Sequence, residues 1–189
     1  AIGSWNGKMQ TSKTLDPGLR RVVSVWLPRF ATDLYIRRQA RQTVPSGRSN
    51  FRRPKLFDAG TMPLALVTKM NAHTVLAAVN RTAEKAGLQP GLPLPDARAR
   101  CSGLHIAPSD LPGDYKALEA LTAWCVRYTP WTATDMDPNA TGTRGLWLDI
   151  SGSAHLFGGE NALLTDLSYR LTHLGYAHRL AIADTPGVA

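Results

Sequence analysis

Cysteines and long apolar runs are scarce in this sequence. Its 189 residues contain two cysteines, Cys101 and Cys125, and neither lies in a Cys/His cluster, so the pattern favours neither a disulfide framework nor a zinc site. Apolar runs such as residues 64–67 are far shorter than the roughly 18 residues that cross a bilayer. The first twenty residues hold no apolar segment of the kind that directs secretion. We therefore expect a soluble globular domain in the reducing cytoplasm, with no membrane partner.

Acidic residues are the minority, and the excess of positive charge is local. The chain has 22 Lys and Arg against 14 Asp and Glu, which gives a net charge of +8. Residues 20–55 alone carry ten basic residues and one acid, Asp33, whereas the rest of the chain is close to neutral. Such a segment attracts polyanions, with nucleic acid first and anionic lipid second. The alternative is a solvated, partly disordered basic loop.

The alternation of apolar strands and amphipathic helices predicts an α+β fold. Strands are expected at 22–27, 145–150 and 179–183, with a hairpin from 63–67 and 73–79. Helices are expected at 30–41, 80–87, 96–101, 115–128 and 161–175. Residues 1–20 are interpreted as a tail, and residues 43–61, rich in Pro, Ser, Gly and Arg, as a flexible insertion. The layout is one core with a helical insertion between residues 29 and 108.

Few acidic residues are placed to hold a metal ion. Asp135 and Asp137 form the one close carboxylate pair, and paired acids can hold two Mg²⁺ ions for nucleotidyl transfer. Their neighbours Pro138 and Asn139 are typical of loops, which favours a solvated turn. Asp149 lies in an expected strand, where it is either a metal ligand or the cap of the turn that follows at residues 151–153.

A set of short segments, in one order along the chain, resembles the Y-family (translesion) DNA polymerases. The segments are residues 22–30, 63–67, 87–94, 101–108, 127–130, 148–153 with 156–158, and 180–183. The order of the whole set is more specific than any one segment. The resemblance implies a right-hand fold whose palm, a mixed or antiparallel sheet backed by helices, comprises residues 21–28 and 109–189. The fingers would be a small helical insertion at residues 29–108, and residues 1–20 would be a tail.

The resemblance also locates the positions at which the family holds its metal ions and the triphosphate. Trp26 and Pro28 stand at the two carboxylates of the first strand, and Arg144 and Gly145 stand at the later Asp-Glu pair. The triphosphate contacts of the family fall on Arg81, Glu84 and Pro186. Neither Trp nor Pro offers a side-chain oxygen to Mg²⁺. We expect Arg144 to place a cation where the metal would sit, a repulsion of about 4 kcal/mol per metal charge at about 4 Å.

A Y-family frame with these substitutions resembles the ImuB-like subgroup of bacterial mutagenesis cassettes. Residues 76–81, 128–131 and 181–187 are close to sequences of that subgroup. The resemblance implies a non-catalytic, cytoplasmic and nucleoid-associated organiser of translesion synthesis and damage-induced mutagenesis, without a cofactor. The implied partners are DNA, a RecA-like accessory protein, an error-prone polymerase of the replicative class, and the sliding clamp. The clamp would bind a segment beyond the palm that this sequence lacks.

Three hypotheses about function remain open on the sequence. The first is a scaffold that binds DNA weakly and without base readout, through a basic surface formed by Arg37, Arg38, Arg41, Arg52, Arg53 and Lys55. The alternative is an active, Mg²⁺-dependent translesion polymerase that uses the displaced acids Asp135, Asp137 and Asp149. A third is a domain that binds membrane surfaces or polyanions in general through the basic helix 30–41.

Overall fold

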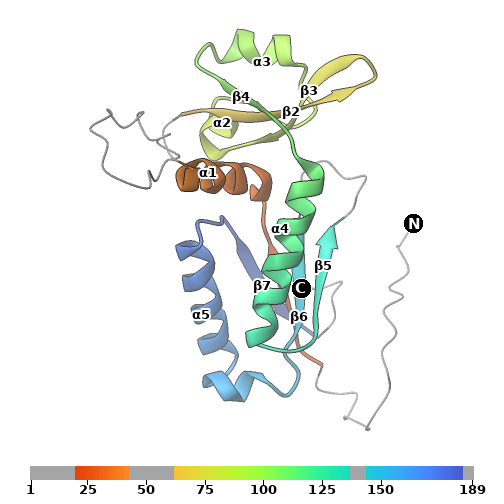
Figure 1. Cartoon of the computed structure of the whole chain (residues 1–189). Coiled ribbons are helices and arrows are strands. Elements are labelled where there is room, and N and C mark those ends of the chain that lie inside the picture. Colours follow the sequence, from red (N-terminus) through yellow and green to blue (C-terminus); the bar gives the residue numbers. More distant parts are fainter. Residues whose placement is uncertain (1–19, 43–61, 137–143, 185–189) are drawn as a thin grey trace, which may run out of the picture.

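The larger of two β-sheets forms the lower half of the molecule in Figure 1. The computed structural model describes residues 20–42, 62–136 and 144–184. The larger sheet has the order β5-β6-β1-β7, and all neighbouring pairs are antiparallel. Its strands are β1 (Val22–Trp26), β5 (Thr132–Met136), β6 (Arg144–Asp149) and β7 (Arg179–Ala183). Helices α4 (Leu111–Trp124) and α5 (Glu160–His173) pack on one face of this sheet.

The smaller sheet has the order β3-β2-β4 and lies above helix α1 in Figure 1. β2 (Leu64–Met70) pairs antiparallel with β3 (His73–Val79) and parallel with β4 (His105–Pro108). Two short helices, α2 (Arg81–Lys85) and α3 (Leu94–Arg100), pack on this sheet. The Asn80 side chain accepts the N–H of Ala83 and caps α2. The hairpin and both short helices lie where the sequence predicts them.

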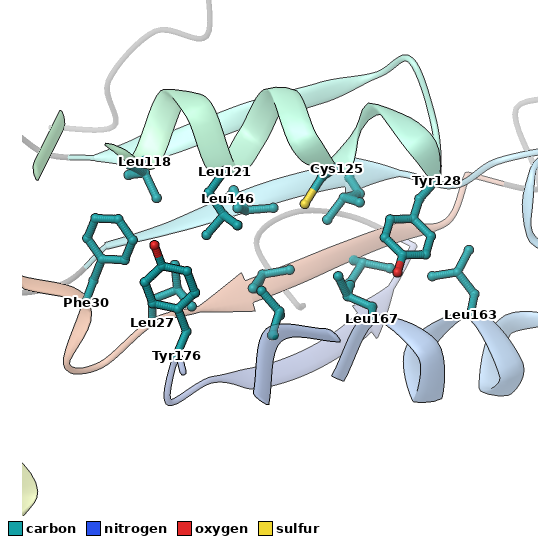
Figure 2. Packing of buried hydrophobic residues seen from close by; sticks show 14 of the residues in the cluster. Leu27, Phe30, Leu118, Leu121, Cys125, Tyr128, Leu146, Leu163, Leu167 and Tyr176 are labelled. Atoms are coloured by element: carbon teal, nitrogen blue, oxygen red, sulfur yellow. The ribbon is translucent and has the colours of Figure 1, made fainter. Parts of the chain in front are cut away.

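The main hydrophobic core lies between the larger sheet and its two helices. Val23, Val25 and Leu27 alternate along and just after β1, so they all point toward the helices. They meet fully buried leucines of α4 and α5, among them Leu118, Leu163, Leu167 and Leu171 (Figure 2). Each buried leucine contributes roughly 2 kcal/mol of hydrophobic free energy. This packing orients β1 and therefore fixes which residues reach the opposite face of the sheet.

Helix α1 (Phe30–Gln42) connects the two sheets by packing on both. Phe30 and Leu34 belong to the main core, and the Phe30 ring stacks on Tyr176 with centroids 5.3 Å apart. Ala31 and Tyr35 pack instead against the cluster under the smaller sheet. The two faces of one helix therefore couple the two halves of the molecule.

Strand β5 is the main difference from the sequence prediction. The sequence predicts a solvated turn at Asp135, but this residue lies in an edge strand that pairs with β6. Edge strands often carry polar residues, and β5 accordingly lacks the apolar pattern from which a strand is predicted. Its backbone hydrogen bonds come from pairing with β6. Asp137 lies outside the described residues, as do residues 1–19 of the expected tail and the insertion 43–61.

Helix ends also differ slightly from the prediction. Helix α4 begins at Leu111, where Asp110 caps the N–H of Gly113, and it passes into a 3₁₀ turn (Cys125–Arg127). A second 3₁₀ turn (Ala154–Phe157) precedes α5. Among the described residues, no helix has both the length and the apolar character needed to cross a membrane.

Candidate functional site

A row of four residues crosses one end of the larger sheet. Trp26 pairs with Gly145 on one side and with Arg179 on the other, and Gly145 pairs with Asp135. These residues alternate with core residues such as Val25, so their side chains belong to the sheet face opposite α4 and α5. The Arg179 guanidinium carbon lies 4.9 Å from the centre of the Trp26 ring. The row thus presents an indole, a glycine, one carboxylate and one guanidinium.

The end of β1 offers no side-chain oxygen at this row. Trp26 is the last residue of the strand, and Pro28 stands in the turn that leads into α1. Between them, the buried Leu27 donates its N–H to the carbonyl oxygen of Arg144 at 2.8 Å. Because Pro28 has no N–H, the pairing with β6 stops here and the chain turns into the helix.

Arg144 points away from this row and into the protein. It is the first residue of β6, and its Nη1 donates to Oδ2 of Asp114 in α4 at 2.6 Å. Both side chains are almost fully buried, with 6% and 4% of their surface exposed. The expectation that Arg144 presents a free cation to a metal ion is therefore wrong. Its side chain lies on the helix-covered face of the strand, where a carboxylate neutralises it.

The Arg144–Asp114 ion pair ties the start of β6 to the start of α4. Burial raises the pKa of Asp114, and the hydrogen bond and charge of Arg144 act against this increase. Asp114 lies in the first turn of α4, where a negative charge also interacts favourably with the helix dipole. A buried charge without its partner costs several kcal/mol, so each residue stabilises the other in this position.

Gly145 occupies a point where two backbones approach closely. A Cβ atom at this position would lie 2.6 Å from the carbonyl oxygen of Val25 on β1. Real Cβ atoms do not approach so closely, and the obstacle is backbone rather than a flexible side chain. A glutamate at this position therefore does not fit on the present backbone.

The two described acids of the alternative hypothesis lie at opposite ends of the sheet. Asp135 is opposite Gly145, whereas Asp149 is opposite Val22, four residues further along β6. Four residues of strand span about 13 Å. Oδ1 of Asp149 accepts the N–H of Ser151 at 3.0 Å, so this residue caps the turn after β6. Across residues 20–42, 62–136 and 144–184, no group of three or more His, Cys, Asp or Glu side chains is placed to hold a metal ion.

A second set of charged residues lines a hollow of about 600 Å³ between α1, α2 and the segment before β7. Arg29, Arg81 and Lys85 supply three cations, and Asp33 supplies a carboxylate. Glu84 is engaged by Arg29, whose Nη1 lies 3.2 Å from Glu84 Oε2. Of the residues expected at the triphosphate contacts, Glu84 pairs with Arg29, three residues after the end of β1, and Arg81 lines the same hollow as Arg29. Pro186 lies outside the described residues.

Asp33 links α1 to the segment before β7, and burial raises the pKa of its carboxyl group. Its Oδ2 accepts the N–H of Ala177 at 2.8 Å. Burial raises the pKa of this carboxyl from 3.8 to about 6, against the lowering effects of the Ala177 N–H and of the charges of Arg29 and Arg37. The folded protein therefore holds this proton more tightly than the unfolded chain does. The contribution of Asp33 to stability is full below about pH 4 and is lost as the pH rises through about 6.

Asp33→Asn should flatten this part of the pH profile. The amide oxygen still accepts the Ala177 N–H, but the group no longer titrates. Relative to the variant, the wild-type free energy of unfolding should fall by about 2 kcal/mol between pH 4 and pH 7.5. Urea unfolding at several pH values measures the difference. If the unfolding free energies of the two proteins change in parallel with pH, the raised pKa of Asp33 is contradicted. Glu119→Gln, on the exposed side of α4, serves as the control.

The structure brings together three of the six residues predicted to contact DNA. Arg37, Arg38 and Arg41 line one groove, together with residues of α4 and of the segment after α5. They lie on the helix side of the molecule rather than on the sheet face that carries Trp26. The other three, Arg52, Arg53 and Lys55, lie outside the described residues. Contact between these six residues and DNA stays a prediction.

Asp114, the residue that pairs with Arg144, is not among the site residues that the sequence predicts. One signal was present, because strand alternation places Arg144 on the same face as Leu146 and Leu148, which is the buried face. A buried arginine requires an acidic partner. Nothing in the sequence distinguishes Asp114 from other acids for that role, since the two residues are 30 positions apart.

Solved structures of Y-family DNA polymerases share this fold. The post-insertion binary complex of Dbh DNA polymerase matches with a TM-score of 0.61 at 12% identity. DinB from Sulfolobus solfataricus matches with a TM-score of 0.58 at 14% identity. Each match covers 86% of this chain and 42% of the solved chain. The sheet with its two helices is therefore a Y-family polymerase palm fold, as the sequence resemblance implied.

The sequence comparisons give the family itself. The impB/mucB/samB family model matches residues 49–189, and the chain belongs to this family. Protein ImuB from two strains of Caulobacter vibrioides is 48% identical over 103 residues, which are 54% of this chain. The matched region is 21% of the length of those ImuB proteins. The chain thus corresponds to a part of its curated relatives and is a homologue of ImuB over that part.

Proposed function

We propose that this protein is a non-catalytic member of the family that binds DNA and partner proteins in translesion synthesis and damage-induced mutagenesis. The supporting observation is the row at the end of the larger sheet. Two-metal nucleotidyl transfer needs carboxylates on adjacent strand ends to hold Mg²⁺ against a triphosphate. Here the adjacent positions on β1 and β6 are Trp26 and Gly145, and a side chain at Gly145 would meet the β1 backbone.

The remaining positions add to the same conclusion. Pro28 has no oxygen to offer, and Arg144 is engaged with Asp114 in the core. The one carboxylate in the row, Asp135, lies on the edge strand and is separated from β1 by β6. Of the acids in the alternative hypothesis, Asp135 lies opposite Gly145 and Asp149 lies at the other end of β6, whereas Asp137 lies outside the described residues.

The similarity to ImuB supports the same kind of partners for this scaffold. We infer that it acts with DNA, with a RecA-like accessory protein, with an error-prone polymerase of the replicative class and with the sliding clamp. The clamp contact would lie beyond the palm. Because these partners act on chromosomal DNA, we infer that the protein is cytoplasmic and associated with the nucleoid. The positive segment at residues 20–55 would add a phosphate-driven attraction to DNA that is independent of base sequence.

One experiment with the full-length protein tests the proposal. The protein should bind a primer–template, and its affinity should fall at least tenfold between about 50 and 200 mM salt. With Mg²⁺ or Mn²⁺ present, it should extend the primer by no nucleotide. Arg52→Glu combined with Arg53→Glu and Lys55→Glu should weaken binding, while Arg98→Glu on exposed α3 should not.

Two results would overturn the proposal. Metal-dependent incorporation that disappears in Asp149→Ala or Asp135→Ala would establish the active polymerase instead. A DNA affinity that changes neither with salt concentration nor with the triple charge reversal would contradict the predicted DNA surface. Primer extension by a known polymerase on the same primer–template confirms that the substrate is competent.

A further inference from the structure

Helices α1 and α4 and the end of α5 come together on one side of the molecule (Figure 1). Side chains of these elements and of the segment after α5 line a groove with an apolar floor. Its volume is about 250 Å³. The floor is formed by Leu34 of α1, by Leu121 and Trp124 of α4, and by Leu174 and Tyr176 after α5. These residues belong to the main core or pack against it, so the groove is an opening of that core toward the surface rather than a feature of one loop.

Three arginines form one side of this groove. Arg37, Arg38 and Arg41 follow one another along the last turns of α1. The described lining of the groove contains no acidic residue. Three guanidinium groups therefore lie beside an apolar floor, and the groove lining itself carries positive charge.

These arginines are only partly neutralised. Arg38 pairs with Asp110 at 2.9 Å, and this pair is half-exposed. The Arg37 guanidinium lies 4.2 Å from the centre of the Tyr176 ring, which positions it over the groove, and its Nη1 is buried without a hydrogen-bond partner among the described residues. In the described part of the chain, Arg41 forms no ion pair, and it is exposed. Because Arg37 and Arg41 both line the groove, an incoming carboxylate can hydrogen-bond the exposed Arg41 and also interact with the charge of Arg37.

We propose that this groove binds an acidic segment of a partner protein, which inserts an apolar side chain against Leu34 and Trp124 and places carboxylates on Arg37 and Arg41. The apolar floor favours a peptide over DNA, because a phosphate backbone has no apolar side chain to bury there. The insertion at residues 43–61 is an unsuitable occupant, since it carries four basic residues and one acid. This inference deepens the proposed scaffold function and rests on it, because it names one surface for partner proteins.

Peptide selection on the immobilised chain tests the groove directly. Phage that display random 12-residue peptides are selected for binding to the wild-type chain. Phage that also bind either of two groove variants are then removed. Arg41→Glu reverses the charge of the rim, and Ala120→Trp fills the groove from an exposed position of α4. Enriched peptides should combine acidic residues with Leu, Phe or Trp. Synthetic versions should lose at least tenfold in affinity with either variant and keep it with Arg98→Glu.

Three other outcomes would contradict the proposal. An absence of groove-dependent peptides, or peptides that lack acidic residues, would overturn it. If a labelled 20-residue oligothymidine loses its binding in Arg41→Glu and Ala120→Trp instead, the groove is a nucleic-acid surface. Circular dichroism of each variant confirms folding. Failure here is distinguishable from failure of the proposed function, because that function is tested by primer extension and by charge reversal at Arg52, Arg53 and Lys55, whereas the groove is tested by peptide binding.

Discussion

Asp114→Asn should cost the fold about 3–5 kcal/mol of unfolding free energy. The substitution keeps the size of the side chain but leaves the Arg144 guanidinium, which is 6% exposed, without a counter-charge. A neutral amide still accepts one hydrogen bond, yet it does not compensate the cost of keeping a cation out of water. Because the pair joins the start of β6 to the start of α4, unfolding should begin at a lower denaturant concentration for the whole palm core.

Two companion variants separate the charge from other effects of the substitution. Arg170→Met removes one partner of the half-exposed Arg170–Asp166 pair on α5, and it should cost less than about 1 kcal/mol. The double variant Asp114→Leu with Arg144→Met replaces both charges by apolar groups and should recover most of the stability. Urea unfolding followed by circular dichroism gives all three values. A cost below 1 kcal/mol for Asp114→Asn would show that the pair is not buried in solution.

Gly145→Ala is the second substitution with a large expected effect. The new methyl group would stand 2.6 Å from the Val25 carbonyl oxygen, so β1 and β6 must move apart where they pair. We expect a loss of about 2 kcal/mol or more, although alanine normally suits a strand better than glycine does. The same displacement would move Trp26, the residue paired with Gly145.

Gly103→Ala provides the matched control for this prediction. Gly103 is exposed, and nothing lies within 4 Å of the position of a Cβ atom there. Its substitution should change the unfolding free energy by less than about 0.5 kcal/mol. Thermal unfolding of the two variants gives the comparison, and equal midpoints would contradict the close approach at Gly145. If the prediction holds, introducing a glutamate at this position requires a different backbone as well as a different side chain.

For the arginines of α1, the local sequence predicts the kind of surface they form but not which other elements lie beside it. Their clustering in the sequence indicates a polyanion-binding surface. Their position beside Trp124 and Tyr176 depends on how α1 packs against α4 and against the segment after α5. Sequence spacing along one helix states which residues share a face, but it does not state which other element that face meets.

Local sequence patterns were sufficient to predict the α+β class and the places of most strands and helices, and the order of short segments was sufficient to predict the family. These follow from short-range patterns, because the period of apolar residues reflects the geometry of a single helix or strand. Three features became visible only in the three-dimensional arrangement: the edge strand at residues 132–136, the pairing of Arg144 with Asp114, and the separation of Asp135 from Asp149. Each of these depends on contacts between residues distant in the chain, and the free energy of such contacts comes from burial and strand pairing that no local pattern encodes.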